Sequence, residues 1–108
     1  MSLPPDFSIQ ATTADGRTTL TATGEIDMGT VAEFAAAIRG ALREGPVLLD
    51  LRGVQFMDSS GVRTINMVLK ERAGNGHELR ICREMHDSVR QIFELTGMLG
   101  VLPLEDCA

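Results

Sequence analysis

The residues of this 108-residue chain that are best suited to chemistry form the run Asp58-Ser59-Ser60-Gly61. They lie where the apolar segment 47–51 gives way to a helical pattern that begins at Val62. In an open α/β sheet, ligands and partners bind at this edge. Ser and Asp are also preferred helix N-caps, because their side-chain oxygens accept hydrogen bonds from the first free amides. Local chemistry alone therefore favours a helix cap, with a binding or modification site as the alternative.

A serine in this position is also a plausible phosphate acceptor. A phosphate at a helix N-terminus gains hydrogen bonds from backbone amides and the positive end of the helix dipole. It adds roughly −1.5 to −2 charges at one point, which the neighbouring Asp58 repels. A partner docked over Asp58, Ser59 and Ser60 would meet this new charge and bulk. The run could thus switch binding on or off without refolding the domain.

Enzyme motifs find little support in the sequence. A GxGxxG fingerprint and a Walker A loop are both absent, and Met57 and Asp58 stand where a G-x-S-x-G elbow needs its first glycine. A helix of about 14 residues would place His77 roughly 20 Å from the serines. His86 is better placed, but a lone histidine at a helix start is more often a solvated or capping residue.

The carboxylates of Asp27, Asp50 and Asp58 show no metal-ligand spacing, and Asp50 falls inside an expected strand. The sequence therefore predicts a protein that is not an enzyme and that holds no cofactor or metal. An enzyme or nucleotide-binding protein that uses the Asp27 and Ser60 edge is the weaker alternative.

Composition limits the kinds of partner. The net charge is −5 and the only aromatic residues are four Phe, which argues against nucleic acid and against an anionic membrane surface. No apolar run approaches the ~18 residues of a membrane span, and residues 1–6 lack the pattern of a signal peptide. These features predict a cytoplasmic protein. Cys82 and Cys107 lack metal-type spacing; a disulfide between them is left open, but a reducing cytoplasm favours two free thiols.

The elements expected around these residues follow from periodicity. Residues 7–12 and 19–26 alternate in polarity across the Asp15-Gly16 turn, which predicts an antiparallel hairpin. Helical stripes then alternate with strands at 47–51 and 78–82, and a short edge strand is expected at 101–104. The order β-β-α-β-α-β-α-β predicts one α/β domain over residues 7–108, after an N-terminal tail of residues 1–6. Its sheet is mixed and mostly parallel after the hairpin, with helices packed on one face.

Asp27 ends the second expected strand and precedes the first expected helix. Either Asp27 or Thr30 would cap that helix, and for Asp27 the cap is the favoured interpretation. The alternative is that its carboxylate faces the same sheet edge as the serines and forms part of a binding surface there.

Four segments together resemble the STAS domain of bacterial anti-sigma factor antagonists. They are Gly24-Glu25-Ile26-Asp27, Val47-Leu48-Leu49-Asp50-Leu51, Phe56-Met57-Asp58-Ser59-Ser60-Gly61 and Glu94-Leu95-Thr96-Gly97. The resemblance covers roughly Phe7 to Leu104, and its most specific element is the Asp-Ser-Ser-Gly run. It implies a single STAS-like domain, with a sheet that carries helices on one side.

The resemblance also implies a partner-switching function. The unphosphorylated protein would bind an anti-sigma factor that is also a GHKL-type serine kinase, and so free a sigma factor. Phosphorylation of Ser60 would break that complex, and a PP2C-type phosphatase would restore it. The antagonist itself would be a monomer or weak dimer. The alternative in this family is a constitutive STAS scaffold in a transporter or stress-signalling complex, in which the serines only cap the helix.

The motif match assigns the partner surface residue by residue. Ser59 and Asp58 would support Ser60 at the kinase-docking surface, and Asp27 matches the family's loop aspartate near it. Gly61 and Arg63 complete the predicted partner-binding set. Arg63 stands where small or aliphatic residues are frequent in the family, and it adds a positive charge about one helical turn from Ser60. The segment Arg83-Glu84-Met85-His86 likewise replaces a turn of the Asn-Pro-Ser type.

Overall fold

A five-stranded mixed sheet forms the centre of the computed structural model, which describes residues 7–72 and 76–107. The strands follow one another in chain order across the sheet. The first pair is antiparallel and the remaining pairs are parallel. The strands are β1 (Ser8–Ala14), β2 (Arg17–Ile26), β3 (Val47–Met57), β4 (Leu79–Cys82) and β5 (Leu104–Glu105). The predicted hairpin is confirmed: Asp15 (φ 54°) and Gly16 (φ 77°) both adopt the left-handed conformation that a two-residue hairpin turn requires.

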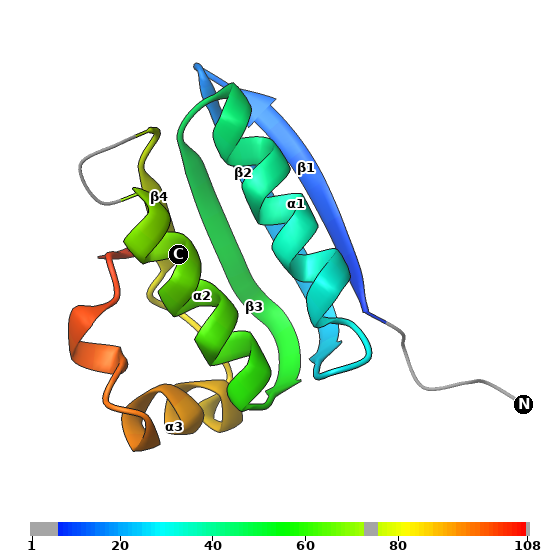
Figure 1. Cartoon of the computed structure of the whole chain (residues 1–108), viewed down its shortest axis with the longest axis vertical. Coiled ribbons are helices and arrows are strands. Elements are labelled where there is room, and N and C mark those ends of the chain that lie inside the picture. The colour runs from blue at the N-terminus through cyan, green and yellow to red at the C-terminus, as the bar shows by residue number, and fades with distance from the viewer. Residues whose placement is uncertain (1–6, 73–75, 108) are drawn as a thin grey trace, which may run out of the picture.

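Two long helices lie side by side over one face of the sheet (Figure 1). They are α1 (Val31–Glu44) and α2 (Ser59–Arg72). The shorter α3 (Asp87–Leu95) is tied to the end of β3 by a 2.7 Å hydrogen bond that the Ser88 hydroxyl donates to the Gln55 carbonyl. A 3₁₀ turn, η1 (Leu99–Val101), then leads to β5. The predicted one-faced α/β architecture is confirmed. Among the described residues, no helix is long and apolar enough to cross a membrane.

The core lies between the sheet and the two long helices. Leu49 and Leu51 in the central strand are fully buried, and they pack with fully buried side chains from both helices: Phe34, Ile38, Leu42, Ile65 and Val68. Side chains alternate across a strand, so Leu48 and Asp50 face away from the helices. The core thus fixes both long helices on one face of the sheet, with α2 running back alongside β3 (Figure 1).

Several element boundaries differ from the predictions. The strand expected at 47–51 continues to Met57, because its pairing with β2 resumes after irregularities in the register. The helix expected from Val62 begins at Ser59, so both serines lie in its first turn. The edge strand expected at 101–104 is replaced by η1 and the shorter β5. Gly97 ends α3 with a left-handed φ of 74°, as predicted. Of the predicted breaker that follows α2, residues 74 and 75 lie outside the described residues.

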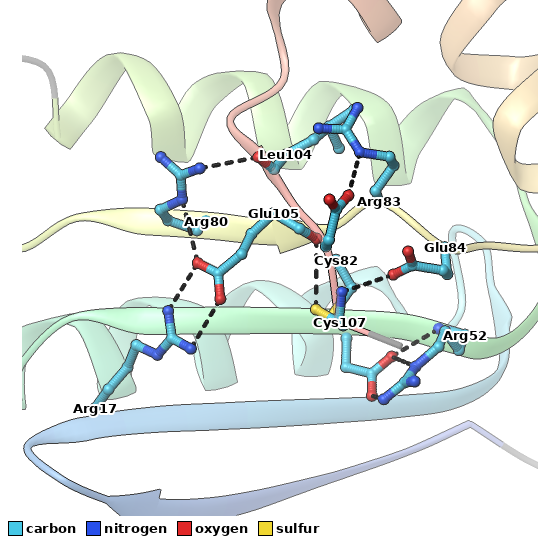
Figure 2. Close-up of a disulfide and its surroundings, with 11 residues drawn as sticks. Arg17, Arg52, Arg80, Cys82, Arg83, Glu84, Leu104, Glu105 and Cys107 are labelled. Atoms are coloured by element: carbon cyan, nitrogen blue, oxygen red, sulfur yellow. Dashed lines mark hydrogen bonds and ion pairs between the residues drawn. A yellow bond between two sulfur atoms is a disulfide. The ribbon is translucent and has the colours of Figure 1, made fainter.

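The expectation of two free thiols is wrong in this structure. Cys82 and Cys107 form a disulfide, with 5.5 Å between their Cα atoms (Figure 2). The cause is the pairing of β4 with β5, which sets Cys82 opposite Glu105. Cys107 follows Glu105 by two residues, the spacing that returns a side chain to the same side of an extended chain.

Candidate functional site

The predicted site residues gather where β2 and β3 end. Ile26 and Met57 are paired across the two parallel strands, and the Asp58 amide donates a 3.0 Å hydrogen bond to the Ile26 carbonyl. Asp27 and Asp58 come directly after these paired residues. The structure therefore brings the two loops to one edge of the sheet, as the sequence predicts for parallel neighbours.

Asp58 holds the first turn of α2. Its Oδ1 accepts one hydrogen bond from the Ser60 amide, at 2.9 Å, and another from the Ser60 hydroxyl, at 2.5 Å. Asp58 thus performs the capping role that local chemistry predicts for this run, while Ser59 and Ser60 are the first two residues of the helix. Ser60 is half-buried and its hydroxyl is oriented by Asp58, whereas Ser59 is exposed.

Gly61 allows the helix to approach the sheet closely. A Cβ atom at this position would lie 2.6 Å from Cγ of Met57 and 3.0 Å from Cγ2 of Ile26, both of which are buried. Only glycine fits here without movement of these neighbours. Because Gly61 is itself buried, it supports the site from beneath, and its burial argues against the direct partner contact that the motif match assigns to it.

The Asp27 loop has a different construction from the one predicted. The α1 N-cap position belongs to Thr30, whose hydroxyl accepts from the Asp27 amide (3.0 Å) and donates to the Glu25 carbonyl (2.9 Å) rather than bonding to the helix. The Asp27 carboxylate accepts a 2.8 Å hydrogen bond from the Gly29 amide. The preferred prediction, that Asp27 caps α1, is therefore wrong. Its carboxylate instead shapes the loop beside the start of α2.

A shallow groove of about 290 Å³ runs along the start of α2. It is lined by Ser59, Val62, Arg63, Asn66, Thr96 and Met98. Two exposed apolar side chains belong to the same sheet edge, Met28 in the Asp27 loop (84% exposed) and Phe56 near the end of β3 (45% exposed). Sequence reasoning missed the contribution of Thr96 and Met98, because only the packing of α3 against α2 brings them here. The groove and its apolar neighbours resemble a surface for another macromolecule more than a pocket for a small substrate.

The other candidate catalytic residues lie elsewhere. His86 precedes α3 and lines a separate depression with Arg52, Glu84 and Met85, so it does not share the groove with Ser59. Within residues 7–72 and 76–107, no three His, Cys, Asp or Glu side chains gather as metal ligands would.

Asp50 takes part in a structural ion pair. It is buried on the face of β3 that is turned away from the helices, and it accepts hydrogen bonds from the Arg52 amide (3.0 Å), Nε (3.0 Å) and Nη2 (2.9 Å). The side-chain hydrogen bond from Arg52 is the main reason that the pKa of Asp50 lies below its usual value.

The fold and this site define a class: small α/β domains with a mixed sheet, long helices on one face and a pair of serines at a strand-to-helix junction. Comparison with known proteins makes the assignment specific. The chain belongs to the STAS domain family, whose model matches residues 8–106. The resemblance seen in the sequence is thereby confirmed, and this family consists of regulatory binding proteins rather than enzymes.

Its relatives are anti-sigma factor antagonists. The chain is 34% identical over 73 residues to the putative anti-sigma factor antagonist BtrV of Bordetella bronchiseptica, a match that covers 68% of this chain and 60% of BtrV. It is 27% identical to the anti-sigma-B factor antagonist of Staphylococcus aureus, over 94% of both chains. The solved structure of an anti-sigma factor antagonist from Mycobacterium paratuberculosis shares the fold, with a TM-score of 0.81 at 24% identity over 99% of this chain and 92% of that one.

The fold is also shared with a phosphorylated protein. The structure of the Bacillus cell fate determinant SpoIIAA in its phosphorylated form has a TM-score of 0.62 at 20% identity, over 95% of this chain and 92% of that one.

Proposed function

We propose that this chain is an anti-sigma factor antagonist controlled by phosphorylation of Ser60. The unphosphorylated form binds an anti-sigma factor that is a GHKL-type serine kinase, and this binding releases a sigma factor. The observation that carries the proposal is the Ser60 hydroxyl, which Asp58 orients at the first turn of α2. The preceding residue, Ser59, lines the open groove. The names of the relatives in the STAS family support the same function.

The chemistry of Ser60 explains how one modification would act as a switch. The kinase forms a bond between Ser60 Oγ and the γ-phosphorus of ATP, while the bond from that phosphorus to the β-phosphate oxygen breaks and ADP leaves. The hydroxyl proton that Ser60 donates to Asp58 is lost to a base of the kinase or to solvent. A phosphate of roughly −1.5 to −2 charges then stands beside the Asp58 carboxylate. The phosphate and the Asp58 carboxylate would compete for the Ser60 amide, because Asp58 already accepts a hydrogen bond from that amide.

The change would stay local. Gly61 and Val62, which follow Ser60 directly, are buried against the sheet and hold the helix in place. A partner seated over the groove would instead meet new charge at its interface. The modified antagonist would therefore dissociate from the kinase while it remains folded, and a PP2C-type phosphatase would return it to the binding form.

Phosphorylation in vitro tests the proposal. Incubation with the cognate anti-sigma kinase and ATP is expected to give a single phosphoserine, which Ser60→Ala abolishes. Ser59→Ala is the matched control, because it removes the exposed neighbouring hydroxyl and should leave labelling intact. Full labelling of Ser60→Ala would refute the assignment of the site.

Binding tests the switch itself. Ser60→Asp should weaken kinase binding by placing charge at the interface, while Ser60→Ala, which adds no charge at the same position, should weaken it less. Unchanged affinity for Ser60→Asp would contradict the charge mechanism. Recovery of a transporter subunit and no kinase in a pulldown from native cells would favour the scaffold alternative.

A further inference from the structure

The C-terminal segment that follows Leu102 rests on the edge of the sheet. Leu102 is buried, at 8% exposure, and the half-buried Leu104 packs against the same core. The other residues of 103–107 are half-buried or exposed and add no further apolar anchor. The strand in this segment, β5, has only two residues. The segment is therefore joined to the core by the apolar side chains of Leu102 and Leu104 and, at its end, by the Cys82–Cys107 bond.

Polar contacts supply the remaining attachment (Figure 2). The Arg83 amide donates to the Glu105 carbonyl at 2.8 Å, and the Cys107 amide donates to the Glu84 carboxylate at 3.0 Å. The Glu105 carboxylate accepts two 2.9 Å hydrogen bonds from Arg17 and lies 3.4 Å from Nε of Arg80. These charged side chains are 29–38% exposed, and ion pairs of this kind contribute little to stability and are screened by salt.

We propose that the Cys82–Cys107 disulfide is a reversible redox site that latches residues 103–107 onto the edge of β4. With the bond formed, the segment cannot leave β4. With the bond reduced, the two-residue strand, the half-buried Leu104 and the partly exposed ion pairs are left to retain it, and it opens more readily. The latch depends on this chain's own cysteines and does not require the proposed partner switch.

The reductant would be a dithiol, and burial decides which sulfur it attacks. Cys82 is 1% exposed, whereas Cys107 is only half-buried. A dithiol thiolate attacks Cys107 Sγ, and the sulfur–sulfur bond breaks to release Cys82 as a thiolate, which takes up a proton. The second dithiol sulfur then displaces Cys107, which is protonated in turn. Two electrons and two protons pass to the protein, and the reductant leaves as its cyclic disulfide.

Opening of the latch would change one edge of the molecule. The Ile81 and Arg83 amides would lose their partners, the Pro103 and Glu105 carbonyls. Arg17 and Arg80 would lose the Glu105 carboxylate. Reduction would thus expose an unpaired, positively charged strand edge, the kind of edge that folded proteins normally keep covered.

Hydrogen exchange of the whole chain, with dithiothreitol as the reductant, tests the latch. The Arg83 and Cys107 amides should exchange at least tenfold faster in the reduced protein than in the oxidised one. The Leu51 amide in the central strand should not change. Cys107→Ser is the matched control: it should exchange at Arg83 like reduced wild type, and dithiothreitol should have no further effect on it.

Three results would overturn the proposal. Equal exchange at Arg83 in oxidised and reduced wild type would show that the bond does not hold the segment. Alkylation of both cysteines by iodoacetamide in protein purified without reductant would show that the bond does not form. Reduction no faster than global unfolding would identify an inert structural disulfide. Because none of these measurements uses a kinase or sigma factor, they are independent of the proposed phosphorylation switch.

Discussion

Replacement of Asp58 by alanine separates the capping role of this carboxylate from the switching role proposed for Ser60. Asp58 Oδ1 accepts hydrogen bonds from both the amide and the hydroxyl of Ser60, so Asp58→Ala removes both at once. Ser60→Ala removes only the hydroxyl bond and leaves the amide at position 60 capped. The two variants should therefore differ in stability, although they disrupt the same pair of residues.

The magnitudes follow from these contacts. Loss of an Asp N-cap costs about 1 kcal/mol, with a range of about 0.5–2, and loss of a negative charge at a helix N-terminus adds about 0.3–1 kcal/mol. We expect Asp58→Ala to lower the free energy of unfolding by about 1–2 kcal/mol. Ser60→Ala should cost less than about 1 kcal/mol, because its half-buried site keeps the backbone bond and alanine has the higher helix propensity. Asp58→Asn, which keeps an acceptor oxygen without the charge, should fall between them.

Urea unfolding at neutral pH measures these differences as shifts in the midpoint at constant slope. Thermal unfolding should agree, since each 1 kcal/mol corresponds to roughly 4–8 °C in a domain of about this size. If Ser60→Ala proves as destabilising as Asp58→Ala, the serine hydroxyl rather than the Asp58 carboxylate holds the helix, and the division of roles is wrong.

Two further predictions concern packing and pH. Gly61→Ala should destabilise the fold by about 1–3 kcal/mol in urea unfolding, because the new Cβ meets Met57 and overpacking outweighs the better helix propensity. Gly100→Ala, where a Cβ meets nothing within 4 Å, is its control, and an equal effect of both substitutions would contradict the packing argument. The lowered pKa of Asp50, caused first by its hydrogen bond from Arg52, means that the unfolded chain binds more protons just below the usual Asp pKa of about 3.9. This contribution to stability is present above that pH and is lost as pH falls toward the lowered folded-state pKa. Asp50→Asn should therefore show a smaller drop in urea midpoint than wild type between pH 6 and pH 3. An identical drop in the two proteins would show that the Asp50–Arg52 pair does not contribute to this pH dependence.

The elements that local patterns determine could be predicted from the sequence. The hairpin depends on strict alternation across the Asp15-Gly16 turn, and the three helices depend on stripes that recur within each segment. The part of β3 that the sequence did not predict, residues 52–57, forms for a different reason. Residues 52–57 become a strand because β2 pairs with them beyond a register irregularity, in which Gly53 lies against Thr23. That pairing joins residues some 30 positions apart, and no short window of sequence contains it.

The candidate site likewise has features that the sequence predicts and features that only the structure reveals. Asp58 and Ser60 are near neighbours in the chain, so their cooperation was predictable, but side-chain geometry decided which of them caps the helix. The sequence places Asp27 at the correct edge of the sheet, but the prediction that Asp27 caps α1 is wrong. Thr30 occupies the N-cap position, and its hydroxyl donates to a carbonyl of the preceding strand. The disulfide joins cysteines 25 positions apart. It depends on the β4–β5 register, which the spacing of the cysteines does not reveal.

The helix cap and the proposed phosphorylation of Ser60 are coupled, because both involve the same acceptor atom of Asp58. Asp58 Oδ1 holds the Ser60 amide and the Ser60 hydroxyl together, so a phosphate on Oγ necessarily disturbs the cap that stabilises the helix. The disturbance is tolerable because the amide it frees can bond to the phosphate itself. The buried Gly61 and Val62 keep the first turn against the sheet meanwhile. Under the proposed phosphorylation of Ser60, such a domain would convert one added charge into a changed surface with little change in fold, which is what reversible partner exchange requires.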